Sequence, residues 1–321
     1  MIRKIVKGLL IALVLVLITG LLLAYWPVSW KNKHQAITPE EASSLRQQFM
    51  DPHQVFNASD GETLFLRRWN PDTIVPYKKD LAILIFHGFT AYSGPYSMAG
   101  IPFAEGGYTT FGLDYRGHGL SGGNRGDSPG KDRWIGDLAD AIDYLHHTGY
   151  ARIVVLGHSL GVAAALCAGD TVPGKIAGLV LLSGAYESRP GISKPMPFLQ
   201  KARILSSAIF RPAYQSVEYY REGMHLTDDP LFNYRYTPRF FTMLDVKSLR
   251  LPPDLNIPVL VGVGDQDELF SIDKVREFYD LIPGNKKEFL VMQNTTHAQI
   301  PRSSWEEIVD WLDKTYSDQA R

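Results

Sequence analysis

The chain has 321 residues, of which 45% are apolar and 21% are charged, a composition typical of a globular protein. This length is sufficient for one large hydrophobic core or two smaller ones. The formal net charge is −1 and the sequence has neither a basic tract nor an acidic tail, so nucleic acid is not an expected partner. Cys167 is the only cysteine, which excludes an intramolecular disulfide and a metal cluster held by several thiolates. We expect Cys167 to be a small apolar residue of the core.

An uncharged run rich in Leu, Ile and Val extends from Gly8 to Val28 and is long enough to span a bilayer as a helix. Basic residues precede the run and aromatic residues, which favour the membrane interface, follow at its end: Arg3, Lys4 and Lys7, then Tyr25, Trp26 and Trp30. A cleaved signal peptide would have a shorter apolar region and a small-x-small cleavage site. We therefore favour a retained single-pass anchor over residues 1–30, with the signal peptide as the alternative. The positive-inside rule places the rest of the chain outside the cytoplasm, although Lys31 and Lys33 weaken the charge asymmetry.

The segment from 31 to 52 is polar and is predicted to link the membrane helix to a folded domain. Within it, Thr38 followed by Pro39 and two glutamates indicates a capped helix start. Short runs over 53–59 and 63–69, separated by a turn at Asp60-Gly61, then predict a hairpin.

Strands and helices alternate over most of the remaining chain. Continuous apolar runs predict buried strands, and runs with a 3.6-residue apolar period predict helices. The strands are expected at 81–86, 108–113, 152–156, 177–183, 257–263 and 288–292, and the helices at 96–105, 134–146, 271–281 and 304–316. This alternation predicts a mostly parallel sheet covered by helices.

The alternation stops between residues 186 and 253, where scattered prolines and poor periodicity indicate an inserted cap. The insertion holds eleven aromatic residues, and its ten basic residues against six acidic ones give a net charge of +4. The alternative is an ordinary solvated helical surface with a few core aromatics. The domain that carries the insertion is expected to comprise 53–185 and 254–321.

A β-branched apolar strand breaks at Gly157 and continues, through Gly157-His158-Ser159-Leu160-Gly161, into a helix of small residues. This is the G-x-S-x-G pattern of a nucleophile elbow, in the strand–turn–helix setting where that elbow is found. Glycines flank the serine because the sharp turn leaves little room for a Cβ beside it. Ser159 is therefore a candidate nucleophile, and a tight turn with a capping serine is the alternative.

An unassisted serine hydroxyl is a weak nucleophile at neutral pH, so it needs a base and an acid that orients the base. The histidines after the elbow are His225, in the insertion, and His297, after the last predicted strand. Because reacting groups gather at the carboxyl ends of parallel strands, His297 is the candidate base. Asp265 and Asp267 both follow the preceding strand, and we favour Asp267 because it lies further from the strand end and can reach the histidine loop. Asp265 is then expected to shape the turn through its own backbone.

An acyl-transfer site also needs donors for the oxyanion that forms on the substrate. The candidates are two backbone N–H groups, of Leu160 directly after the serine and of Phe89 in the turn after an apolar strand. His87, His118 and His158 lie in glycine-containing turns near strand ends. We expect them to brace these loops and not to act as bases, since one catalytic histidine suffices.

Several motifs occur in the order found in α/β-hydrolases: His87-Gly88-Phe89-Thr90, Asp114-Tyr115-Arg116-Gly117-His118-Gly119-Leu120-Ser121, Gly157-His158-Ser159-Leu160-Gly161, Gly264-x-x-Asp267 and His297. Over about residues 53 to 316 the chain resembles this superfamily, and in particular its monoacylglycerol lipase and lysophospholipase group. The resemblance implies an α/β-hydrolase fold, here a mostly parallel eight-stranded sheet flanked by helices, with an inserted helical cap and an N-terminal transmembrane helix. It further implies the roles of the site residues: Ser159 as the nucleophile, Asp267 as the acid, His297 as the base, and Phe89 with Leu160 as the oxyanion hole.

We therefore expect a membrane-anchored serine hydrolase that cleaves carboxylic esters of monoacyl lipids, a lysophospholipid or a monoacylglycerol, through an acyl-enzyme. No metal and no organic cofactor is required. The anchor, the aromatic insertion and its positive charge each fit a lipid substrate at an anionic interface. A serine peptidase or a small-ester carboxylesterase on the same fold is the alternative. A binding protein without catalysis is less favoured, because every catalytic position is filled.

Overall fold

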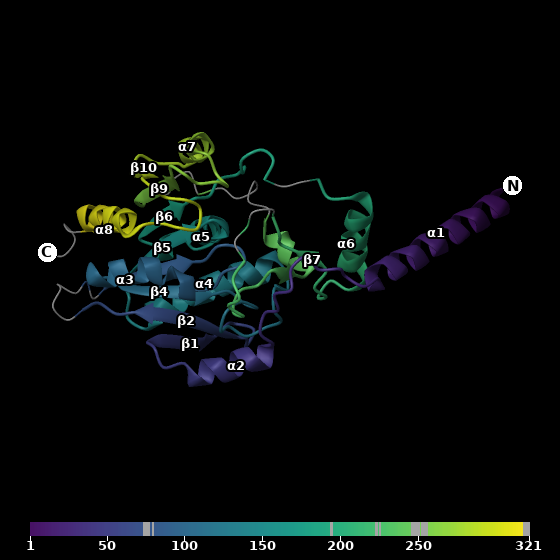
Figure 1. Ribbon diagram of the computed structural model, residues 1–321, viewed down its shortest axis with the longest axis horizontal. Helices are drawn as coiled ribbons and strands as arrows, with labels where there is room; N and C mark the ends of the chain where they lie inside the picture. The colour runs from purple at the N-terminus through teal and green to yellow at the C-terminus, as the bar shows by residue number, and fades with distance from the viewer. Residues whose placement is uncertain are drawn as a thin grey trace.

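The computed structural model describes residues 1–72, 78, 80–192, 195–221, 224, 226–244, 251 and 256–316 (Figure 1). The strands of its main sheet are β1 (His53–Asn57), β2 (Thr63–Trp69), β3 (Leu81–Phe86), β4 (Thr109–Asp114), β5 (Arg152–His158), β6 (Gly178–Leu182), β9 (Val259–Gly264) and β10 (Lys287–Met292). They are ordered β1-β2-β4-β3-β5-β6-β9-β10. β2 is antiparallel to its neighbours β1 and β4, and the other neighbouring pairs are parallel. The predicted mostly parallel sheet of eight strands is thus confirmed.

The helices of the described residues are α1 (Ile2–Tyr25), α2 (Pro39–Gln48), α3 (Ser97–Glu105), α4 (Lys131–His147), α5 (Leu160–Thr171), α6 (Phe198–Phe210), α7 (Ile272–Leu281) and α8 (Arg302–Tyr316). Short 3-10 helices occur at η1 (Gly94–Tyr96), η2 (Pro173–Lys175) and η3 (Pro238–Leu244). A two-stranded antiparallel ribbon, β7 (Val217–Glu218) with β8 (Arg235–Tyr236), lies apart from the main sheet.

The strands and helices that the apolar pattern predicts are present, with boundaries shifted by three residues or fewer. α4 begins earlier than predicted because its first turn, Lys131-Asp132-Arg133, is polar and lies outside the apolar period. β5 extends past its apolar run because Gly157 pairs with both flanking strands, β3 and β6, and His158 pairs with β6. Pairing in the middle of a sheet therefore overrides the break that glycine suggests.

Helices cover both faces of the sheet, and each face has its own apolar core. On one face, α4, α5 and α7 pack through residues such as Trp134 and Phe278. On the other face, α3 and α8 pack against each other, with Phe103 edge-on to the fully buried Trp305. Cys167 is buried among the residues of the first core, as expected. The strands between these layers are therefore apolar on both faces, which explains their continuous apolar runs.

In the segment predicted to be an inserted cap, the described residues form α6, the β7–β8 ribbon and η3, so this cap is only partly helical. Its aromatic residues lie in three different environments. Tyr219 stacks on Phe89 beside the sheet's carboxyl edge, Tyr236 is fully buried, and Phe198 on α6 is 85% exposed. Several predicted features of the insertion lie outside the described residues: Lys194, Glu222, His225, Asp245, Lys247, Arg250 and the boundary at 253–254.

The segment before the first strand packs against the cap. Thr38 forms the predicted cap of α2, as a reciprocal capping box with Glu41. The backbone N–H groups of Lys31 and Asn32 donate to the Glu218 carboxylate of the ribbon, at 2.8 and 2.9 Å. The predicted linker is thus tied to the cap by hydrogen bonds over part of its length.

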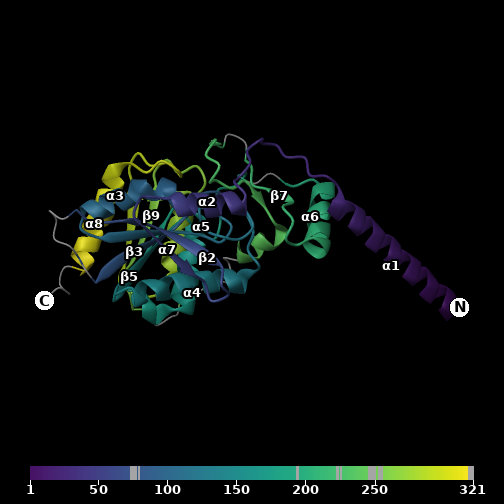
Figure 2. The ribbon, with the colours of Figure 1, turned by 90° about the horizontal axis from the view of Figure 1, so that it is seen from below.

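α1 lies beside α6, and the two views in Figures 1 and 2 show it extending away from the cap and from the sheet. With 24 residues and a mean hydropathy of 2.7 in its most apolar part, α1 is long and apolar enough to span a membrane. Its C-terminal part contacts the cap, where a Cβ on Gly20 would lie 2.9 Å from the ring of Phe210. Arg211 lies 4.4 Å from the ring centre of Tyr25, and Ala24 is 1% exposed. The last turns of α1 are therefore part of the folded structure.

Candidate active site

The turn between β5 and α5 places Ser159 at the carboxyl edge of the sheet. Ser159 has φ 57° and ψ −118°, a backbone conformation that costs a residue with a side chain about 1–3 kcal/mol. Two glycines permit it: a Cβ on Gly157 would lie 2.1 Å from the carbonyl oxygen of Gly161, and a Cβ on Gly161 would lie 2.0 Å from that of Phe86. No side chain fits at either position without moving the backbone. The glycines thus allow α5 to approach the strands closely while the serine stands in the turn.

Three of the predicted site residues lie within hydrogen-bonding distance of one another. Nε2 of His297 is 2.9 Å from Oγ of Ser159, and Nδ1 of His297 is 3.1 Å from Oδ2 of Asp267. His297 is 7% exposed and Asp267 is 1% exposed. Burial alone would raise the pKa of Asp267, but the hydrogen bond and charge of His297, with two backbone N–H donors, hold it below its usual value. Asp267 is therefore a carboxylate that can orient the imidazole and stabilise its protonated form.

The turn after β9 contains two aspartates, and Asp267, not Asp265, makes the bonds within the turn that were expected of Asp265. Oδ1 of Asp267 accepts from the N–H groups of Leu269 and Phe270, at 2.8 and 2.9 Å, so Asp267 itself shapes the turn. Asp265 instead accepts from the N–H of Thr295 in the histidine loop, at 3.0 Å. The expectation that Asp265 shapes the turn through its own backbone was therefore wrong. One carboxylate can close a turn with one oxygen and hold histidine with the other.

The two predicted oxyanion donors flank Ser159. Leu160 begins α5, and Phe89 follows β3, whose last residues pair with β5. Among the hydrogen bonds of the described loops and caps, none is donated by the N–H of Phe89 or of Leu160. Gly88 allows the Phe89 turn to approach the serine, because a Cβ there would lie 3.2 Å from Cβ of Ser159. Both N–H groups thus remain candidate donors to a developing negative charge.

A buried hydrogen-bond network connects the turn after β3 that carries Phe89, here called the oxyanion turn, with the loop after β10 that carries His297, the histidine loop. The N–H of Gly88 donates to the hydroxyl of Tyr96 at 2.7 Å, and this hydroxyl lies 2.8 Å from Nδ1 of His158. Nε2 of His158 lies 2.9 Å from the carbonyl oxygen of His297. Since a carbonyl only accepts, Nε2 carries the proton and Nδ1 accepts from Tyr96. Burial, and then the neighbouring His297, lower the pKa of His158 to about 3, so it stays neutral.

The other two histidines that were expected to brace loops are also buried and bonded to backbone. His87 accepts from the N–H of Tyr115 at 3.2 Å, and Nδ1 of His118 lies 3.1 Å from the carbonyl oxygen of Arg116. Burial lowers the pKa of His87 to about 3 and that of His118 well below its usual value. Neither ring contacts Ser159, so their geometry is that of loop supports.

Sequence reasoning missed four residues that contact this site. Glu268 accepts from the N–H of His297, Tyr96 forms the network above, and Arg189 and Arg221 bond the turn that carries Asp267. Glu268 directly follows the predicted acid, and this adjacency was the only available signal. The two arginines come from the divergent insertion, where no motif distinguishes them from the other basic residues.

Two cavities meet at Ser159. One, of about 300 Å³, is mainly apolar and is lined by Leu160, Leu166, Ile192, Tyr219 and Phe270, among others. The second, of about 590 Å³, is also mainly apolar, with Leu226 and Phe232 in its lining, but it additionally holds His297 and the charged side chains of Arg221 and Glu268. Both cavities are lined by Phe89 as well as by Ser159. A substrate bound across Ser159 would therefore extend into two mainly apolar spaces, of which, among the described residues, only the larger is lined by charged side chains.

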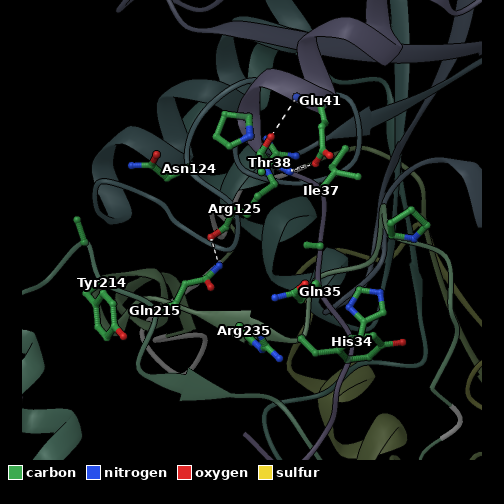
Figure 3. Close-up of a pocket in the computed structure, with 15 residues that line it drawn as sticks. His34, Gln35, Ile37, Thr38, Glu41, Asn124, Arg125, Tyr214, Gln215 and Arg235 are labelled. Carbon is green, nitrogen blue, oxygen red and sulfur yellow. Dashed lines mark hydrogen bonds between the residues drawn. The ribbon is translucent and has the colours of Figure 1, made fainter. Parts of the chain in front are cut away.

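A further cavity of about 780 Å³ lies away from this chemistry (Figure 3). The segment around Thr38, the loop at Arg125 and the cap residues Gln215 and Arg235 surround it, and Gln215 donates across it to the carbonyl oxygen of Arg125 at 2.7 Å. None of the five predicted site residues lines this space. Cavity size alone thus does not indicate where the reacting groups are.

Residues 77–300 match the family described as serine aminopeptidase, S33, over more than half of the chain. The chain belongs to this family of α/β-hydrolases. A monoacylglycerol lipase of Mycolicibacterium smegmatis is 25% identical over 246 residues, which are 71% of this chain and 84% of that protein. The human monoglyceride lipase is 26% identical over 302 residues, 85% of this chain and 95% of that protein. The chain spans less than half of some other relatives that it matches.

The fold of this S33 family member is also found in solved structures. The structure of a soluble variant of the Saccharomyces cerevisiae monoglyceride lipase, in complex with a substrate analogue, aligns with this chain with a TM-score of 0.67 at 16% sequence identity. The alignment covers 90% of this chain and 99% of the yeast chain. The α/β-hydrolase fold expected from the sequence is therefore shown.

The contacts of Asp267 and Asp265 predict different effects of removing each charge. We expect Asp267→Asn to slow the reaction of Ser159 with a fluorophosphonate by about 10³-fold or more, because an amide cannot hold the required tautomer of His297. Asp265→Asn should slow it less than about tenfold, because the amide oxygen can still accept from Thr295. Labelling rates of the two matched variants provide the measurement. Equal rates would contradict the assignment to Asp267, and a greater loss in Asp265→Asn would assign the acid to Asp265.

Proposed function

We propose that this S33 family member is a membrane-anchored serine hydrolase that cleaves carboxylic esters of monoacyl lipids, lysophospholipids or monoacylglycerols, through an acyl-enzyme. The observation that carries the proposal is the 2.9 Å contact between His297 and Ser159 at the junction of two mainly apolar cavities, the larger of which also holds charged side chains. Relatives named as monoacylglycerol and monoglyceride lipases support the substrate class. No step of this chemistry needs a metal or an organic cofactor.

The proposed reaction has two halves. In the first, Oγ of Ser159 attacks the ester carbonyl carbon while His297 takes its proton, and the N–H groups of Phe89 and Leu160 bind the oxyanion. The tetrahedral intermediate then expels the alcohol, whose oxygen receives the proton from His297. In the second half, water attacks the acyl-enzyme with His297 as base, and collapse of the intermediate releases the fatty acid and restores Ser159. Asp267 stays ionised and stabilises the imidazolium in both halves.

The position of His297 orients the substrate in this proposal. The leaving oxygen must lie near Nε2, so the alcohol part occupies the larger cavity, which His297 and polar side chains line. The acyl chain then occupies the smaller cavity, whose walls are the apolar faces of α5 and α7 with Tyr186 and Tyr219 of the cap. Burial of an alkyl chain there contributes roughly 0.8 kcal/mol per methylene. A monoacyl ester, with one alkyl chain and one polar alcohol part, fits a small apolar space beside a larger one that also holds charged groups.

The exposed surface of the cap supports an anchored enzyme. α6 packs on α1 and also presents the exposed side chains of Phe198, Leu199, Leu205 and Ile209. Two positive charges of the cap are neutralised within the protein, since Arg239 pairs with Asp127 and Arg221 with Glu268. The exposed apolar side chains beside α1 thus support binding of the cap to a membrane surface more directly than the net charge of the insertion does.

Labelling tests the nucleophile. A fluorophosphonate should label the wild type and should not label Ser159→Ala, because the probe forms its bond with the activated serine. Ser44→Ala, a change on the exposed face of α2, is the control and should be labelled at the wild-type rate. Mass spectrometry of the labelled peptide locates the adduct, and equal labelling of Ser159→Ala contradicts the proposal.

A substrate panel tests the specificity. We expect turnover of a lysophospholipid or a monoacylglycerol to exceed that of a short-chain ester and of an aminoacyl amide. Ile192→Trp should shift the preferred acyl chain to shorter lengths by filling the smaller cavity, whereas Leu226→Trp, in the larger cavity, should alter the preferred alcohol. Preference for the aminoacyl amide would instead identify a peptidase, and preference for the short ester a carboxylesterase.

Retention of α1 tests the anchor. We expect the mature protein to remain in membranes after an alkaline wash and to keep residues 1–25 by intact mass, because the end of α1 packs on the cap. Placing two aspartates within the span, Leu13→Asp with Leu17→Asp, should release the protein, since each acid costs about 3 kcal/mol near the bilayer centre. A wild-type chain that begins after Ala24 would identify a signal peptide.

A further inference from the structure

The cap holds the turn that carries Asp267 through two arginines. The N–H of Arg189 donates to the carbonyl oxygen of Leu269 at 2.8 Å, and its Nε donates to the carbonyl oxygen of Asp267 at 3.0 Å. Arg221 donates to Oε1 of Glu268 at 3.1 Å. The turn is therefore attached to two separate parts of the insertion.

Glu268 also reaches the base itself. While Oε1 pairs with Arg221, Oε2 accepts from the backbone N–H of His297 at 3.0 Å. A single carboxylate thus lies between a cap arginine and the residue that must move the proton. Its second bond fixes the backbone of the histidine loop at the residue where Asp267 fixes the ring.

We propose that Glu268 is a positioning residue for His297, and that Arg221, through its ion pair with Glu268, links the position of the cap to the proton affinity of the base. The proposal rests on the proposed function, because it assumes that His297 is the base for Ser159. It concerns a pair of residues that none of the sequence motifs includes.

The charged groups that face His297 come from two elements of the described structure. The acid turn supplies Asp267 and Glu268, and the cap supplies Arg221 through Glu268. Arg189 reaches only the backbone of this turn. From the end of β5, His158 contacts the histidine loop, but it is buried and neutral. Burial alone would raise the pKa of Glu268. The N–H of His297, the backbone N–H of Glu268 itself, the charge of His297 and, last, the bond with Arg221 hold the pKa below its usual value, so Glu268 is ionised at neutral pH.

Removing the two charges should therefore displace the acid limb of the pH–rate profile in opposite directions. The enzyme needs His297 neutral, and a negative charge nearby favours the imidazolium form. Glu268→Gln removes that charge, so the acid limb of kcat/KM should move to lower pH by about half a unit for a partly exposed group. Arg221→Gln leaves the negative charge of Glu268 uncompensated, so the limb should move to higher pH by a similar amount.

The experiment compares pH profiles of kcat/KM for the full chain in detergent, with a monoacyl ester as substrate. In the double variant, Glu268→Gln with Arg221→Gln, the two displacements should largely cancel. On the alkaline plateau, Glu268→Gln should lower kcat about three- to tenfold, because a neutral amide holds the histidine backbone less firmly. Glu277→Gln, which removes an exposed carboxylate on α7, is the matched control and should leave the limb unchanged.

The outcomes separate this proposal from the proposed function. If the wild type hydrolyses no ester and Ser159 takes no fluorophosphonate, the proposed function fails. If the wild type is active but both single variants keep its acid limb, or move it in the same direction, the coupling through Glu268 is wrong. A loss of rate alone, without opposite displacements, would reduce Glu268 and Arg221 to supports of the fold.

Discussion

The close approach of α5 to the sheet is the constraint on which the remainder of the site depends. Gly161 lies against the carbonyl of Phe86, so the elbow is held against the end of β3. The same strand end leads directly to Phe89, which places the proposed oxyanion donor beside the serine turn. The strained backbone of Ser159 persists because buried strands on either side of β5 determine the path of the chain. One glycine contact thus positions the hydroxyl and one donor together.

The cap contributes to the active-site scaffold as well as covering it. Asn233 donates to the carbonyl oxygen of Thr90 at 2.8 Å, and the N–H of Thr90 donates to the hydroxyl of Tyr236 at 3.0 Å. The insertion therefore holds the oxyanion turn on one side of Ser159, while Arg189 holds the acid turn on the other. A displacement of the cap would disturb both turns, since their bonds are to backbone atoms.

The sequence predicted the parts that local patterns determine. Buried strands produce continuous apolar runs, and the carboxyl ends of parallel strands meet, so Ser159, Asp267 and His297 could be proposed as neighbours before their distances were known. The contacts of Glu268 could not be predicted, because Arg221 is 47 positions away in a segment without periodicity. The β7–β8 ribbon was missed because strands of two residues leave no alternating pattern. The contacts of Asp265 were predicted wrongly, since a residue's preference for local bonding yields to an available partner on the adjacent loop.

The packing of α1 on α6 gives the proposed anchor a defined orientation. A membrane helix joined to an enzyme by a free linker lets the enzyme tumble above the bilayer, whereas here the helix contacts the cap, and the cap contacts both turns of the site. The mouth of the site would keep a fixed height and tilt relative to the membrane, and substrate would arrive by lateral diffusion in the lipid layer. Exchanging α1 for an unrelated membrane helix would preserve attachment but lose that alignment.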